Sequence, residues 1–210
     1  MRRVVDLTMP IHEGMTTFPS ENHPRVEISQ LGRHGLDGRE TRKIVMGTHT
    51  GTHVDAPLHF FSGGGTIDDV DLEQLCGPAA IAVLSSPCDI SQLDEVLKRR
   101  AERLVLRSDW SDYLDTNNYY NHYPYLIGPV VQRIIASGCR VLAMDMPSPD
   151  KPGDPIMPAH KVLMDAGIIL VESLVNLRYI RSPVFELVVA PLKIRGGDGA
   201  PARVFAIERD

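Results

Sequence analysis

The chain has 210 residues, 43% hydrophobic and 23% charged, so it can bury one substantial core, and we expect a single domain over residues 1–210. A formal net charge of -5 and the lack of any basic block argue against nucleic acid or an anionic membrane as the main partner. No run of eighteen apolar residues and no signal-peptide pattern occurs, which predicts a cytoplasmic protein. Three cysteines without paired spacing fit reduced thiols.

Short apolar runs alternate along the chain with segments of helical spacing. The runs predict strands at residues 4–7, 25–30, 43–46, 79–84, 104–107, 141–144, 168–171, 185–190 and 203–208. Apolar residues at three- and four-residue steps predict helices at residues 91–101, 128–137 and 158–166. Strands interleaved with helices indicate an α/β domain with a mixed β-sheet core and flanking helices.

The segment 49–60, HTGTHVDAPLHF, is the most informative part of the chain. His49, His53 and Asp55 offer two imidazoles and a carboxylate without a thiolate, a ligand set that suits zinc, manganese or another divalent metal. Nearby glycines and Pro57 disfavour a helix, so we expect extended backbone over residues 53–59, with alternate side chains on one face. In a straight strand His49 would lie roughly 13 Å from His53, and the chain must therefore turn near Gly51.

His59 lies farther along this segment and is interpreted as a neighbour of the metal. A neutral imidazole can take a proton from water, or give one to a leaving group, near neutral pH. We therefore expect His59 to be the general acid or base. The alternative is a structural metal site or a cluster of histidines without catalytic function, although structural zinc sites are usually rich in cysteine.

The second half of the chain offers two further candidate ligands. Pro158 is typical of a helix start and places His160 in the first turn of the predicted helix. Glu172 directly follows a buried apolar run, where a carboxylate is costly unless it is paired, hydrogen-bonded or bound to metal. From the residues alone, Glu172 could equally be an ion-paired or capping residue, and His160 a surface histidine.

Segment 49–60 resembles the signature of the cyclase family of metal-dependent hydrolases, to which bacterial kynurenine formamidases belong. The likeness extends from residues 5–8, through 77–79, to 191–194 and 198–201. It implies a fold of the swivelling β/β/α type and a homodimer or higher homo-oligomer. It also implies that His49, His53 and Asp55 bind one metal, that Asp55 bridges to a second ion held by His160 and Glu172, and that His59 is catalytic. We expect two zinc ions per subunit, with manganese as the alternative.

Phe18 is the expected substrate-binding residue. The segment 15–19, MTTFP, resembles that of kynurenine formamidases, which usually carry at the position of Phe18 a tryptophan that contacts the aromatic substrate. Phenylalanine keeps a flat apolar face for stacking on a small aromatic substrate but lacks the indole N–H. The phenylalanine at position 18 therefore does not change the family assignment, but it affects the assignment of the substrate.

The resemblance implies hydrolysis of N-formylkynurenine to kynurenine and formate. In that reaction the metal would activate water, while His59 would assist proton transfer and protonate the departing amine. One alternative is an isatin-hydrolase-like enzyme that opens a cyclic amide or lactone. Another is a non-catalytic, metal-dependent binding protein.

Three other segments are placed around the site. The proline-rich stretch 147–155 is expected to be a rigid loop that leads to the His160 helix and borders the substrate pocket. The glycine-rich stretch 62–66 lacks the lysine of a phosphate-binding loop and is interpreted as a turn. Aromatic residues between positions 110 and 125 predict a subunit interface or a pocket wall: Trp110, Tyr113, Tyr119, Tyr120, Tyr123 and Tyr125.

Overall fold

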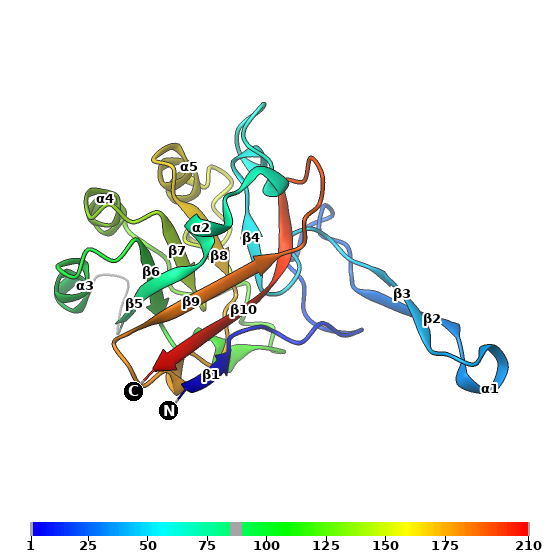
Figure 1. The fold of residues 1–210 in the computed structure, drawn as a ribbon. Coiled ribbons are helices and arrows are strands. Elements are labelled where there is room, and N and C mark those ends of the chain that lie inside the picture. The colour runs from blue at the N-terminus through cyan, green and yellow to red at the C-terminus, as the bar shows by residue number, and fades with distance from the viewer. Residues whose placement is uncertain (1, 85–89, 210) are drawn as a thin grey trace.

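A closed, mixed β-sheet forms the body of the protein in a computed structural model that describes residues 2–84 and 90–209 (Figure 1). The strands of this sheet are β1 (Arg2–Asp6), β4 (His53–Asp55), β5 (Gly77–Val83), β6 (Arg103–Arg107), β7 (Val141–Met144), β8 (Ile169–Glu172), β9 (Val184–Pro191) and β10 (Gly199–Arg209). Their order is β1-β10-β4-β8-β7-β6-β5-β9, and β9 also pairs with β10, so the sheet closes into a barrel. Strands β5 to β8 are parallel and the other pairings antiparallel. The mixed α/β sheet is confirmed; its closure was not predicted.

Strands β6, β7 and β8 bury both of their faces, which explains their continuous apolar sequences. Val105 of β6, Ala143 of β7 and Val171 of β8 belong to one core with residues of β9 and β10. The alternate positions, among them Leu106 and Leu142, belong to a second core with apolar residues of the helices. Side chains of one strand therefore serve two cores in alternation.

Three helices cover the outer side of the parallel strands: α3 (Ile90–Leu97), α4 (Gly128–Ala136) and α5 (Pro158–Asp165) (Figure 1). Each was predicted, and α3 ends four residues before the expected end. The short helix α2 (Leu72–Leu75), which was not predicted, precedes β5. No helix among the described residues is long and apolar enough to cross a membrane. Cys76 and Cys139 are free thiols, and Cys88 lies outside the described residues.

A hairpin arm projects from the body (Figure 1). It consists of β2 (Glu27–Gly32) and β3 (Thr41–Val45), which form a separate two-stranded sheet, and of α1 (His34–Asp37) at its tip. Strand β3 is exposed along its whole length, and the large apolar side chains of Leu31, Leu36 and Ile44 are exposed. An isolated hairpin is marginally stable in water, so this arm depends on contacts beyond its own two strands.

The motif segment turns where the sequence requires it but does not stay extended. Gly51 has a φ of 63°, and the turn brings His49 back beside Asp55. Extended backbone over residues 53–59 was wrong beyond Asp55, because Pro57–His59 forms a 3-10 turn. Proline suits the first position of such a turn, since its φ is already fixed near the helical value. His59 consequently leaves the face of β4.

Asp145, directly after β7, should make stability depend on pH. It is fully buried and accepts hydrogen bonds from the Ser108 backbone N–H (2.9 Å) and hydroxyl (2.7 Å), while burial raises the pKa of Asp145 from 3.8 to about 6. A carboxyl with a raised folded pKa holds its proton more tightly in the native state. The contribution of Asp145 to the free energy of unfolding is therefore complete below about pH 4 and is lost as the pH rises to about 6.

In metal-free buffer, we expect the free energy of unfolding of Asp145→Asn, relative to wild type, to rise by roughly 1–3 kcal/mol between pH 4 and pH 7. Urea denaturation at both pH values measures this. Any effect of the amide side chain itself on the free energy of unfolding cancels in this comparison, since it is the same at both pH values. A difference in the free energy of unfolding, Asp145→Asn minus wild type, that stays constant or falls with pH would contradict the assignment.

Candidate metal centre

Asp55 lies at the centre of three imidazoles and is fully buried. Asp55 Oδ1 lies 2.7 Å from His49 Nδ1 and 3.1 Å from His53 Nε2, and Asp55 Oδ2 lies 3.5 Å from His160 Nε2. The pairing of β4 with β8 sets His53 opposite Glu172, and the first turn of α5 supplies His160. The structure thus brings together all five predicted ligands.

Each of the three histidines is held through its other ring nitrogen. His53 Nδ1 lies 2.8 Å from the Gly51 carbonyl, His160 Nδ1 lies 2.6 Å from Asp150, and His49 Nε2 lies 2.9 Å from Asp198. Histidines that bind metal almost always have such a partner, which fixes the tautomer and the ring orientation. The ring nitrogens turned toward the carboxylates Asp55 and Glu172 are therefore held in position to bind an ion.

Glu172 supplies direct support for a cation at this site. Both carboxylates are buried, and Glu172 Oε1 lies 3.1 Å from His160 Nε2 but outside hydrogen-bond geometry, so it has no hydrogen-bond partner among the described residues. A buried carboxylate oxygen without a partner is costly. Burial and then the charge of Asp55 raise the pKa of Glu172, whereas the imidazoles overcome burial and hold that of Asp55 well below its usual range. This donor set fits a divalent metal.

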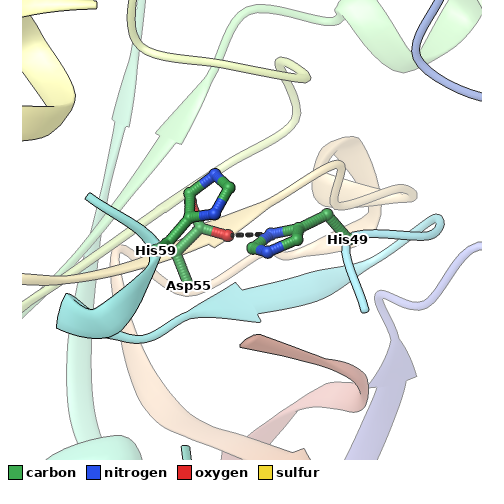
Figure 2. A group of neighbouring side chains, drawn as sticks. All are labelled: His49, Asp55 and His59. Carbon is green, nitrogen blue, oxygen red and sulfur yellow. Dashed lines mark hydrogen bonds and ion pairs between the residues drawn. The ribbon is translucent and has the colours of Figure 1, made fainter. Parts of the chain in front are cut away.

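His59 and His49 converge on Asp55 from two sides (Figure 2). Ligand atoms of these three residues lie within 4.8 Å of one another, as do those of His53, Asp55 and Glu172. Asp55 is common to both groups. The family resemblance implies that His49 and His53 bind the same ion, whereas the distances in the structure place them in separate groups.

The electrostatics of His59 and His49 differ. Burial lowers the pKa of His59 to about 4, whereas Asp55 and Asp198 overcome burial and raise that of His49 to about 9. His59 Nδ1 lies 3.5 Å from Asp198, and its side chain is 27% exposed. The structure therefore places His59 at the margin of the cluster, open on one side.

A cavity that is open to solvent lies over the cluster. The candidate ligands and His59 form its floor, and the other lining residues are Phe18, His23, Tyr120, Pro147, Ser148, Met157 and Ser173. Phe18 packs edge-on against Tyr120, with ring centroids 5.6 Å apart. Phe18 and the start of the proline-rich segment border the cavity. Of the six aromatic residues expected to form a subunit interface or a pocket wall, Tyr120 lines the cavity.

Sequence reasoning missed two carboxylates that hold the histidines. Asp150 accepts hydrogen bonds from the backbone N–H groups of Ala159 (2.6 Å) and His160 (3.0 Å) as well as contacting the His160 ring. Asp198 lies far from His49 in sequence and just before β10. Both sit in loops without periodicity. A buried histidine's need for a second partner was one available signal, and for Asp198 its place in segment 198–201, which carries the resemblance, was another.

Gly199 lets the His49 ring lie against β10. A Cβ at Gly199 would lie 2.7 Å from His49 Cε1 and 2.7 Å from the Val54 carbonyl oxygen. We expect Gly199→Ala to displace His49, to weaken metal binding and to cost about 1–3 kcal/mol of stability. Zinc titration and thermal unfolding measure both effects. Gly35→Ala, at a position with open space around it, is the control, and unchanged zinc affinity in Gly199→Ala would contradict this role.

Buried carboxylates among oriented imidazoles, at the bottom of an open cavity, are typical of metal-dependent hydrolases. The comparisons with known proteins agree with this class. The family model described as "Putative cyclase" matches residues 5–151, and the chain belongs to this cyclase family.

Relatives match the chain over nearly its whole length. A kynurenine formamidase of Bacillus mycoides is 30% identical over 207 residues, which cover 95% of this chain and 94% of the relative. A solved structure described as a "potential metal-dependent hydrolase with cyclase activity" is 27% identical over the full length of both chains, with a TM-score of 0.81. Isatin hydrolase A from Labrenzia aggregata is 25% identical, covers 100% of this chain and 94% of its own, and has a TM-score of 0.81.

Proposed function

We propose that the protein is a metal-dependent amide hydrolase that converts N-formylkynurenine to kynurenine and formate. The observation that carries this function is the position of Asp55, which contacts three histidines and lines the cavity. The kynurenine formamidases and isatin hydrolase among its relatives support a reaction at a C–N bond outside the peptide backbone.

His49, His53, Asp55, His160 and Glu172 would hold the metal, with Asp55 shared between two ions per subunit. Nitrogen and oxygen ligands without thiolate suit zinc and also manganese, and zinc is our assignment. A bound ion of this kind supplies a Lewis acid that polarises the scissile carbonyl and makes water more acidic.

His59 moves the proton. As a neutral imidazole beside Asp55, it accepts a proton from water as the water oxygen bonds to the formyl carbon. The resulting imidazolium then protonates the aniline nitrogen as the C–N bond breaks, which leaves the free amine and formic acid, and the acid releases its proton to water to give formate. Asp198, 3.5 Å from His59 Nδ1, orients the ring and stabilises its charged form. Phe18 and Tyr120 offer apolar faces to the aromatic ring of the substrate.

The experiment is formate release from N-formylkynurenine by protein loaded with zinc or manganese. We expect release with metal and none after chelation, restored when metal is returned. Ring opening of isatin without formate release would assign the alternative activity on cyclic amides. Tight metal binding with turnover of neither substrate would point to a non-catalytic binding protein.

We also place the protein in the cytoplasm as a homodimer or a higher homo-oligomer. Free Cys76 and Cys139 fit a reducing compartment. The projecting arm supports self-association, because its exposed Leu31, Leu36 and Ile44 would lose contact with water in a subunit interface. Light scattering coupled to gel filtration measures the oligomeric state.

A further inference from the structure

His23 lines the cavity but is not needed for the metal cluster. It ends a tight turn in which the Ser20 backbone N–H donates to the Phe18 carbonyl (2.8 Å) and the His23 backbone N–H donates to the Ser20 carbonyl (3.0 Å). These bonds place the imidazole beside Phe18, with ring centroids 5.2 Å apart. The turn therefore brings His23 next to Phe18.

The His23 ring has unused hydrogen-bonding capacity. Its Nδ1 is buried and has no hydrogen-bond partner in the part of the chain that the structure describes. A neutral imidazole carries one donor and one acceptor nitrogen. The nearby Tyr120 hydroxyl already donates to the Thr16 carbonyl, at 3.5 Å. An imidazole without a polar partner beside a cavity suggests a ligand group.

The surroundings of His23 indicate what that ligand group is. Phe18 packs against both His23 and Tyr120, and these rings form a wall suited to a flat aromatic substrate. The His23 and His49 ring centroids are 6.3 Å apart, so His23 lies beside the metal cluster, where the proposed reaction places the scissile amide. If the aromatic ring of a substrate packs on this wall and its amide lies at the metal cluster, the ring position next to the amide points toward His23.

We propose that His23 is a substrate-binding residue that hydrogen-bonds a carbonyl group ortho to the scissile amide on the substrate's aromatic ring. The inference rests on the proposed function, in which N-formylkynurenine carries an aryl ketone at that ring position. Phe18 has no polar atom, so His23 supplies the polar contact on this wall. His23 thereby selects anilides with an ortho carbonyl over plain anilides.

The test compares two formamides that differ in one group, N-formyl-2-aminoacetophenone and formanilide. His23→Phe keeps a ring and removes both nitrogens. We expect it to lower kcat/KM about 5- to 10-fold for the ortho-acetyl substrate, as for one lost hydrogen bond, and less than 2-fold for formanilide. His23→Asn should recover part of the loss. Equal losses on both substrates, or none on either, would overturn the proposal.

Product binding separates failure of this inference from failure of the proposed function. Calorimetry on the metal-loaded protein measures 2-aminoacetophenone against aniline. Wild type should prefer the ketone about 5- to 10-fold, and His23→Phe should lose that preference. If wild type hydrolyses neither formamide yet shows the preference, the proposed reaction fails and the role of His23 stands. Turnover without any preference would overturn the role of His23 alone.

Discussion

Asp55→Ala is expected to yield a folded protein that neither retains metal nor releases formate above background. The carboxylate contacts His49, His53 and His160, so its loss removes the one group common to both sets of candidate ligands. Glu172 then remains as the other buried carboxylate of the candidate ligand set. Metal content after dialysis, measured by plasma mass spectrometry, and formate release are the two readouts.

Asp55→Asn is the matched variant, because it keeps the volume of the side chain and removes the charge. We expect it to lose metal as well, since an amide is a far weaker ligand than a carboxylate. Circular dichroism establishes that both variants fold. Full metal occupancy in Asp55→Ala would reject the shared-ligand role, whatever the activity.

His59→Ala is expected to lower turnover by roughly 10²- to 10⁴-fold, the usual contribution of a general acid or base, while metal content stays at the wild-type level. The physical reason is position: His59 lies at the open margin of the cluster, next to Asp198, and reaches the cavity. Formate release and metal content are measured on the same preparation. His34→Ala, in the exposed helix at the tip of the arm, is the matched histidine control.

The two readouts separate the possible roles of His59. An unchanged rate would reject a function in proton transfer. Loss of metal together with activity would instead make His59 a ligand, as its grouping with His49 and Asp55 permits. Loss of activity with metal retained is the result that the proposed mechanism requires.

The elements buried on both faces were predictable from the sequence, whereas the closure of the sheet was not. Strands β6, β7 and β8 read as continuous apolar runs, and β10, the closing strand, was predicted only in its second half. β4 was expected as extended backbone, but its three residues carry no signal of the pairing with β10, which lies far away in sequence. Pairing between distant segments leaves no local signal, so the barrel could not be derived from patterns within short windows.

The candidate site was predictable to the extent that its residues are contiguous or chemically unusual. His49, His53 and Asp55 form one motif, and Glu172 stands out as a carboxylate after an apolar strand. Asp150, Asp198 and His23 sit in loops, where polar residues are common and carry no distinguishing pattern. Their importance depends on distances across the fold, such as the 2.9 Å between Asp198 and His49 Nε2.

The most direct test of the central claim is a crystal structure of zinc-loaded protein with data collected on both sides of the zinc absorption edge. We expect two anomalous peaks per subunit, one on each side of the Asp55 carboxylate, with His49, His53, His160 and Glu172 as the other protein ligands. Anomalous density elsewhere, with none beside Asp55, would contradict the assignment of this cluster as the metal centre.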